Sequence, residues 1–213
     1  QNARVAVAKY IIDELEKNKT DVVSYIKEIN KDDGSTAISL SAGSGRFHTH
    51  DPEGKFEILK ILIECLEKNG EKLDKYLNNL DHINVNTPLM LAVIGGYFDM
   101  VKYLVDKGAI VDIKTSTGMK AIMLACSSNK IDILKFLLDI TLKQNKNNCD
   151  LELKTLLLSA TEMGRIEIIE YLITELKIDP NIHEFNTTPL NDACRKNQIQ
   201  SLKTLLYLGA DIN

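Results

Sequence analysis

The chain has 213 residues, and 44% of them are hydrophobic, which is enough apolar material to bury a core. Its formal net charge is −4 and both signs are mixed along the chain, so it carries no global basic field for nucleic acid or for an anionic membrane surface. The longest apolar runs are far too short for a membrane span, and we expect no membrane insertion.

The N-terminal stretch "ARVAVAKYIIDELEKN" has the pattern of the second helix of a two-helix repeat whose first helix is missing. We interpret residues 1–30 as this partial repeat with an extended connection. Because the chain also closes at the end of a repeat, without a polar capping helix, we expect it to be a fragment of a longer protein.

Residues 31–83 repeat the same pattern at a longer step, because "LEKN" occurs twice, 51 residues apart. The excess length predicts two insertions, one at 46–55 between the two helices and one at 70–83 after the second helix. The later insertion places four apolar side chains at spacings of three and four residues, which predicts a short amphipathic helix. These side chains are Leu73, Tyr76, Leu77 and Leu80.

From residue 84 the period is close to 33 residues, and each period holds two apolar bursts, the pattern of one helix–turn–helix repeat. A small residue recurs in the first burst, where two helices must cross closely: Ala92, Ala125, Ala160 and Ala193. The second bursts carry stripes of Met, Leu, Ile and Val that we expect in the core. The four repeats are residues 84–116, 117–149, 150–182 and 183–213.

Local chemistry marks the ends of these helices. Thr87-Pro88 and Thr188-Pro189 each place a capping hydroxyl before a proline at the first helical position. Gly118 and Asn186 stand two residues before a capping position and tolerate a left-handed turn there. Gly209 predicts a glycine cap at the end of the last second helix.

With these features the chain resembles the ankyrin repeat family. The resemblance is carried by Thr-Pro-Leu at 87–89 and 188–190, by Gly-Ala-Asp-Ile-Asn at 209–213 and by the 33-residue period. It implies an all-α fold, an ankyrin-repeat solenoid of stacked helix–turn–helix units with insertions in the N-terminal repeats, which occupies residues 1–213 as a single domain. Thr155-Leu156-Leu157 departs from the family pattern, since it stands in place of Thr-Pro-Leu.

The resemblance implies a non-catalytic protein–protein interaction module, a scaffold or adaptor that holds a partner protein on the concave surface of the stack. In this family that surface consists of the turn tips and the exposed ends of the first helices. Carried over position by position, the turn tips supply Ser116, Thr117, Met119, Glu152, Lys154, Glu184, Phe185 and Thr187. The helix ends supply Ser127, Ser128, Glu162, Met163, Arg195 and Lys196. No cofactor, metal or nucleic acid is implied.

Three of these positions leave alternatives open. Phe185 is the candidate anchor, because an aromatic side chain at a turn tip has little to contact unless a partner covers it. The alternative is that Phe185 folds back onto Ile182 and the neighbouring hairpin. Arg195 and Lys196 either pair with an acidic partner or form a solvated pair of charges.

The stretch "HTHDPE" at 48–53 is the one that resembles a chemical site. His48, His50 and the two following carboxylates could offer nitrogen and oxygen ligands to zinc. No further ligand can be assigned from the sequence, so we favour a solvated insertion loop, with a metal site or a partner-contact loop as the alternatives.

The four cysteines show no CxxC spacing, which indicates reduced thiols in an intracellular, cytoplasmic protein. Cys126 and Cys194 directly follow the small alanine of a first helix, so we expect both to pack between helices. Cys149 lies in a polar connection and is the expected reactive thiol.

Two further functions stay open. The first is that the chain is the recognition arm of a larger multidomain enzyme, since both of its ends are fragment-like. The second is a host-directed effector in the host cytoplasm, because the Lys-, Asn- and Ile-rich sequence is similar to ankyrin chains of intracellular bacteria, parasitic protists and large viruses. We expect the fragment itself to be monomeric.

Overall fold

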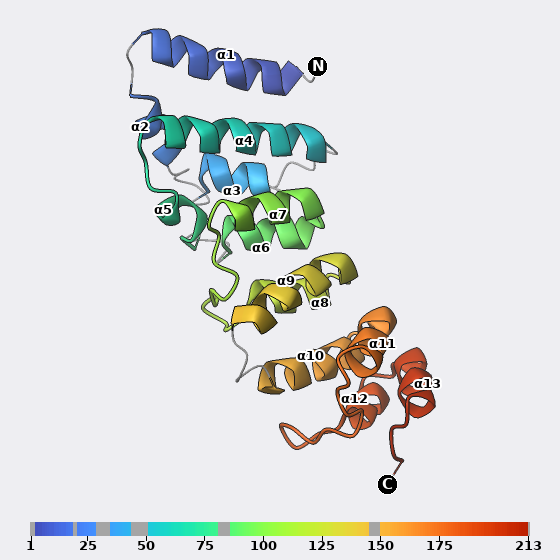
Figure 1. Ribbon diagram of the computed structural model, residues 1–213. Coiled ribbons are helices and arrows are strands. Elements are labelled where there is room, and N and C mark those ends of the chain that lie inside the picture. Colours follow the sequence, from blue (N-terminus) through green and yellow to red (C-terminus); the bar gives the residue numbers. More distant parts are fainter. Residues whose placement is uncertain are drawn as a thin grey trace. The chain divides into compact units, whose positions relative to one another are not determined.

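The computed structural model describes residues 3–18, 21–28, 35–43, 51–80, 86–144 and 150–212 (Figure 1). These residues form helices and the segments that connect them, with no β-strand among them, so the expected all-α class is confirmed. The chain divides into two compact units, Gln1–Ala121 and Ile122–Asn213, called unit 1 and unit 2 below.

The helices of unit 1 pack in pairs. Its described part contains α1 (Ala3–Lys17), α2 (Val22–Lys27), α3 (Ala37–Ala42), α4 (Pro52–Lys68), α5 (Asp74–Leu77), α6 (Pro88–Gly95) and α7 (Phe98–Asp106). Helices α3 and α4 form one pair, α6 and α7 form the next, and α1 lies against α4. The rings of Phe56 and Tyr103 meet edge to face with their centroids 5.6 Å apart, so the second helices α4 and α7 are in direct contact.

Unit 2 repeats this arrangement. It contains α8 (Ala121–Ser127), whose first residue belongs to unit 1, and in its described part α9 (Ile131–Gln144), α10 (Asp150–Glu162), α11 (Ile166–Thr174), α12 (Pro189–Arg195) and α13 (Ile199–Tyr207). Helix α10 pairs with α11 and α12 with α13, while α10 lies beside α12 and α11 beside α13. The ammonium of Lys135 on α9 lies 4.8 Å from the ring centroid of Tyr171 on α11.

The predicted caps are present. The Thr87 hydroxyl accepts the Met90 N–H at 3.3 Å, and the Thr188 hydroxyl accepts the Asn191 N–H at 3.2 Å. A proline follows each threonine at the start of α6 and α12. Gly209 has a φ of +93°, which suits a residue without a Cβ after the last turn of α13. Local sequence therefore sets the ends of these two repeats.

The core consists of the positions that the period selects. The small alanines Ala92, Ala125, Ala160 and Ala193 are at most 1% exposed. The apolar stripes of the second helices are also buried, namely Met100, Val101, Leu104, Ile133, Leu134 and Leu137. Burying each such large side chain contributes about 1.5–3 kcal/mol, which makes these stripes the main source of stability in each unit.

The insertion after α4 forms the short helix α5, as its apolar spacing predicts. Leu77 is fully buried, whereas Leu80 is exposed. Asn78, directly after α5, donates to the Gly108 carbonyl at 3.2 Å and accepts the Ile110 N–H at 2.8 Å. This amide therefore ties the insertion to the loop that follows α7.

The first helix of the repeat at 150–182 begins earlier than its sequence suggests. Helix α10 already includes Asp150, so Glu152 and Lys154 lie in its first turns and not at a turn tip. The physical reason is that Asp150 and Glu152 favour a helix N-terminus, and neither proline nor glycine interrupts the segment. The expected placement of Glu152 and Lys154 is therefore wrong.

Candidate functional site

Three of the candidate residues lie in a tight turn of unit 1. The Gly118 N–H donates to the Thr115 carbonyl at 2.9 Å, and the φ of Gly118 is +80°, as its position before the cap predicts. The Thr115 hydroxyl accepts the Met119 N–H at 3.0 Å and shares a hydrogen bond with the Thr117 hydroxyl. Ser116 and Thr117 are exposed and Met119 is half-buried, so this tip is a well-bonded polar turn open to solvent.

The turn tip of unit 2 is a two-residue hairpin. The backbones of Glu184 and Thr187 exchange two N–H to carbonyl hydrogen bonds of 3.1 and 2.9 Å. Phe185 and Asn186 between them have φ values of +51° and +60°, the left-handed pair of a type I′ turn. The Phe185 side chain is 71% exposed, so it stands out from the tip and does not fold back onto the repeat.

Side chains hold both flanks of this hairpin tip. The Lys154 ammonium lies 3.2 Å from the carboxylate of Glu184 and 2.7 Å from that of Asp150. Hydrogen bonds to Asp150 and then Glu184 raise the pKa of Lys154, which keeps the ammonium charged at neutral pH. On the other flank the Thr187 hydroxyl donates to Asp192 at 2.8 Å. The tip is therefore pinned to α10 and to α12.

The C-terminal ends of the first helices α8, α10 and α12 are bonded from one helix to the next. Arg165 donates to the Ser127 carbonyl at 2.6 Å, and Gln198 donates to the Glu162 carbonyl at 3.0 Å. The Lys196 ammonium pairs with the Glu162 carboxylate at 2.6 Å. These bonds satisfy carbonyls that a helix end leaves open, and they place the three ends side by side in unit 2. We call this surface the helix-end row.

The helix-end row also includes Ser128, which is half-buried, and Met163, which is 39% exposed. Arg195 pairs with the carboxylate of Asp192 at 2.6 Å. Both Arg195 and Lys196 therefore have partners within the chain, while their side chains stay 63% and 45% exposed, as expected for solvated charges.

Asp192 is the residue of this surface that sequence reasoning missed. It is buried, yet it accepts hydrogen bonds from Thr187 and Arg195, so it joins the hairpin tip to the end of α12. The repeat alignment could have revealed Asp192, because the residues at the equivalent position, directly before the small alanine, are Leu91, Leu124 and Ser159. A carboxylate at a position that other repeats fill with leucine or serine indicates a specific partner.

The cysteines differ in how far they are exposed to solvent. Cys126 is fully buried, its thiol lies 3.9 Å from the Leu156 carbonyl, and burial raises its pKa to about 11. Cys194 is exposed, so its expected burial is wrong. Leu156 of α10 lies against the Cys126 thiol, whereas no described helix covers the equivalent face of α12. Cys149 lies outside the described residues.

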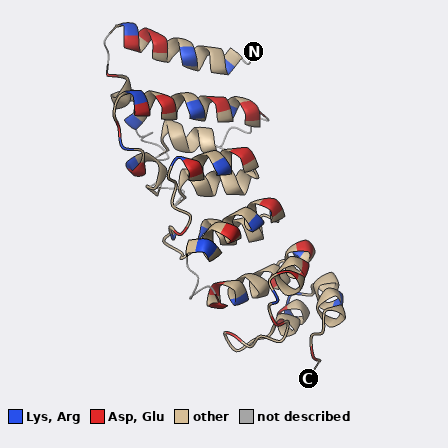
Figure 2. Cartoon of the chain, viewed as in Figure 1, with Lys and Arg blue, Asp and Glu red and all other residues tan. Residues whose placement is uncertain are grey.

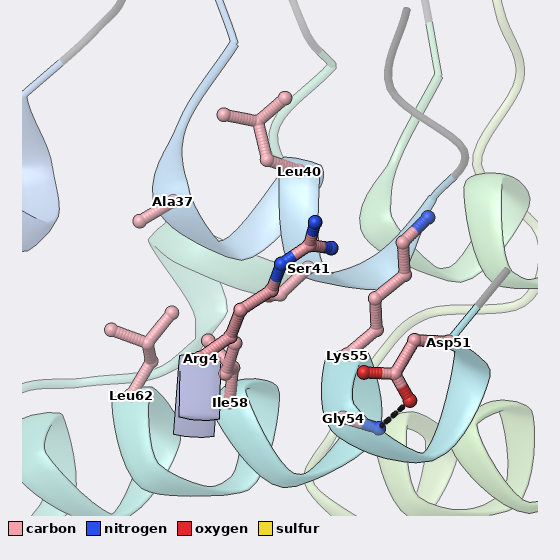
Figure 3. A pocket seen from close by; sticks show the side chains of 9 residues that line it. All are labelled: Arg4, Ala37, Leu40, Ser41, Asp51, Gly54, Lys55, Ile58 and Leu62. Atoms are coloured by element: carbon pink, nitrogen blue, oxygen red, sulfur yellow. Dashed lines mark hydrogen bonds between the residues drawn. The ribbon is translucent and has the colours of Figure 1, made fainter. Parts of the chain in front are cut away.

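The "HTHDPE" stretch is only partly described, since His48 and His50 lie outside the described residues. Asp51 is the N-cap of α4, and its carboxylate accepts the Gly54 N–H at 2.9 Å. It borders a hollow of about 340 Å³ between α1, α3 and α4, with Leu40 and Arg4 on its walls (Figure 3). Lys55 also faces this hollow, but its ammonium donates to the Gly43 carbonyl at 2.7 Å.

Charge does not gather into a patch of one sign on the helices. Figure 2 shows basic and acidic residues interleaved along them. Lysines on second helices lie over aromatic rings of their own helix, with Lys60 4.1 Å from the Phe56 centroid and Lys102 4.3 Å from the Phe98 centroid. Each lysine covers the ring face on which a base would stack. The contact between the ammonium and the ring stabilises the helix.

Neither a membrane segment nor a metal-ligand cluster is found in the part of the chain that the structure describes. Within it, no helix combines the length and the apolar character needed to cross a membrane. The same residues hold no group of three or more His, Cys, Asp or Glu side chains that could bind a metal ion.

Comparison with known proteins agrees with the helix pairs. The family model described as "Ankyrin repeats (3 copies)" matches residues 52–148 and 140–213. The ankyrin repeat domain of human ASB11, a crystal structure, superposes with a TM-score of 0.65 at 20% identity and covers 100% of this chain and 86% of that one. The expected ankyrin-repeat solenoid is confirmed by this likeness of fold.

Sequence relatives are longer than this chain. Ankyrin repeat protein L72 of Acanthamoeba polyphaga mimivirus is 28% identical over 147 residues, which cover 61% of this chain and 35% of L72. Alpha-latrocrustotoxin-Lt1a of Latrodectus tredecimguttatus is 25% identical over 95% of this chain and 14% of the toxin. An ankyrin repeat protein of Rickettsia felis is 26% identical over 97% of this chain and 47% of that protein. The chain thus spans less than half of each of these relatives.

Proposed function

Because the chain belongs to the ankyrin repeat family, whose repeats are generally protein–protein interaction modules, we propose that it binds a partner protein through unit 2. The binding surface combines the hairpin tip at Glu184–Thr187 with the helix-end row, and it is the concave surface of this part of the solenoid. The chain acts as a non-catalytic scaffold or adaptor, as is typical of the fold, and works as a monomer.

One observation carries this proposal. The ends of α8, α10 and α12 are linked by Arg165 to Ser127 and by Lys196 and Gln198 to Glu162. Three helix ends held in register form a preorganised surface, and a partner that binds them does not have to order them first.

The turn at Ser116, Thr117 and Met119 in unit 1 is a second contact element of the same kind. It presents exposed hydroxyls on a backbone held by its own hydrogen bonds. It occupies the turn-tip position of its repeat, so we propose it as a separate contact element of unit 1.

We also propose that the protein works inside a cell. The three cysteines among the described residues are free, and two of them, Cys65 and Cys126, are buried thiols. Buried unpaired thiols are usual where the surroundings keep cysteine reduced.

The length of the relatives favours a second proposal, that the chain is the recognition arm of a larger protein. The chain spans 14–47% of the three relatives described above, one of which is a toxin. In that case the helix-end row selects the target, and other segments supply the activity, either as an enzyme or as a host-directed effector.

The test is capture from a cell lysate by the immobilised chain, read by mass spectrometry. We expect the wild type to retain a specific protein. Met163→Arg places a bulky charge in the helix-end row and should lower the retained amount at least about tenfold. Gln200→Arg adds the same side chain on the exposed face of α13 and should leave capture unchanged. Equal capture by wild type and Met163→Arg, or no protein above empty resin, would contradict the proposal.

A further inference from the structure

Phe185 has a backbone conformation that its side chain disfavours. Its φ of +51° at the first central position of a type I′ turn is normally adopted by Asn, Asp or Gly. A bulky residue with a Cβ is a genuine outlier there, because the Cβ approaches the carbonyl oxygen too closely. The next residue, Asn186, has a φ of +60° and is a usual choice for such a position.

Within the part of the chain that the structure describes, no contact of the Phe185 ring offsets the strain of its backbone. The ring of Phe185 is 71% exposed, and it makes no aromatic or cation–π contact with another described residue. The strained backbone costs stability, and the exposed ring contributes no burial that would offset this cost. Outliers of this kind concentrate at functional sites, where the unfavourable conformation serves an interaction.

The tip that carries Phe185 is held rigidly. Glu184 is fixed by Lys154 of α10, and Thr187 is fixed by Asp192 of α12. The ring is thus presented on a hairpin whose two sides are bonded to two different first helices. A backbone held in this way loses little conformational entropy when a partner takes up the ring.

The charges around the tip are paired within the chain and nearly balanced. Lys154 pairs with Asp150 and Glu184, and Arg195 pairs with Asp192. The two cations and three carboxylates sum to a net charge of only −1, so attraction between net charges contributes little to a partner's affinity.

We propose that Phe185 is the anchor of the interaction, and that the partner is a protein with an uncharged apolar pocket that receives the ring. The inference rests on the proposed function, because it names the partner's chemistry at the same surface. It makes two claims that can be tested separately: the residue costs the free chain stability, and it supplies affinity in the complex.

The first claim needs no partner. Phe185→Asn and Phe185→Gly relieve the strain, so both variants should melt about 2–4 °C above the wild type by calorimetry. Phe185→Leu keeps a Cβ at the same φ and serves as the control, with a melting temperature close to that of the wild type. Equal or lower melting temperatures for both the Asn and Gly variants would overturn the assignment of strain.

The second claim uses the protein that the wild-type chain captures in the lysate experiment, purified as the titrant. We expect Phe185→Asn to weaken its Kd at least about 30-fold, and Phe185→Leu to weaken it less. The wild-type Kd should change by less than about threefold between 50 and 300 mM NaCl, because no net charge drives the association.

Failure of the inference differs from failure of the proposed function. If Met163→Arg abolishes binding while Phe185→Asn binds like the wild type, the surface is correct and the anchor is wrong. A Kd that rises tenfold or more with salt would contradict the uncharged pocket. If the chain captures no protein, the proposed function and this inference fall together.

Discussion

Ser201 is a polar residue in an apolar position. Its counterparts one, two and three repeats earlier are Ile168, Ile133 and Met100, which are buried in the core. Ser201 is also fully buried, and its hydroxyl has no hydrogen-bond partner among the described residues. An unsatisfied buried hydroxyl costs about 1–3 kcal/mol, so this single atom weakens the last helix pair.

Replacing Ser201 with alanine should therefore stabilise the chain. We expect Ser201→Ala to raise the free energy of unfolding by about 1 kcal/mol, because it removes a desolvated hydroxyl without opening a large cavity. Ser39→Ala is the matched control, since the buried Ser39 hydroxyl accepts the Thr36 N–H at 2.8 Å, and its loss should cost about 1 kcal/mol. Urea unfolding of the three proteins measures both values. A destabilised Ser201→Ala would show that the hydroxyl has a partner.

Thiol labelling separates the cysteines. In the folded chain, with Cys149→Ser introduced to simplify the readout, iodoacetamide should modify Cys194 readily. Cys126 should react only after unfolding, because it is buried and burial raises its pKa to about 11. Peptide mass spectrometry over a time course gives the two rates. Labelling of Cys126 as fast as that of Cys194 would contradict the described core.

At the scale of elements, the insertion after α4 is held by a cluster around Glu71. Its carboxylate accepts hydrogen bonds from Lys75, from the Tyr76 hydroxyl at 2.9 Å and from Lys27 of α2 at 3.1 Å. These bonds, in that order, lower the pKa of Glu71 from its usual 4.5 to about 2. The cluster therefore links α2 to the start of the insertion.

This lowered pKa predicts a pH dependence. A carboxylate with a folded pKa below its unfolded value stabilises the fold fully above about pH 4.5, and this contribution is lost as the pH falls towards 2. The melting temperature of the wild type should thus exceed that of Glu71→Gln at pH 6, and the difference should shrink steadily below pH 4.5. Glu57→Gln, which breaks an exposed pair with Lys60, is the control and should show a smaller difference. A difference that is constant from pH 6 to pH 3 would contradict the account.

Two asparagines form equivalent links in different repeats. Asn78 bonds the Gly108 carbonyl and the Ile110 N–H, and Asn181 bonds the Gly209 carbonyl at 3.2 Å and the Asp211 N–H at 2.7 Å. The amide supplied by the insertion thus takes the role of the amide at the end of a regular repeat.

We expect Asn78→Ala and Asn181→Ala each to lower the free energy of unfolding by about 1 kcal/mol, since each removes two hydrogen bonds to a neighbouring loop. Asn129→Gly, at an exposed left-handed turn after α8, is a comparison that removes an amide without such a link and without adding strain at its φ of +55°. Urea unfolding checks all three. An unchanged stability of Asn78→Ala would show that the insertion is not bonded to the loop after α7.

How far the sequence predicts each element depends on whether its determinants are local. Thr87-Pro88 and Thr188-Pro189 specify their caps by themselves, so the starts of α6 and α12 were predictable. The early start of α10 at Asp150 was not, because the repeat pattern points to Thr155 while local helix propensity extends the helix backwards. Asn78 was not predictable either, since its partners lie 30 and 32 residues further along the chain.

At the scale of the whole molecule, the 33-residue period predicts the fold because each repeat buries its apolar face only against its neighbours. The buried alanines and the stripes of the second helices follow from that rule. The period predicts the candidate binding surface less completely than it predicts the fold. The period indicates the turn tips, but the ion pair of Lys196 with Glu162 depends on a contact between repeats that no single stretch encodes.

Hydrogen–deuterium exchange of the chain, alone and with the protein that it captures, would locate the surface on which that protein binds. We expect slower exchange in the complex at the hairpin tip, residues 183–188, and at the ends of α10 and α12, with unchanged exchange along α11 and α13. Protection confined to α11 and α13, with the tip exchanging as in the free chain, would contradict a partner bound on the first-helix side of unit 2.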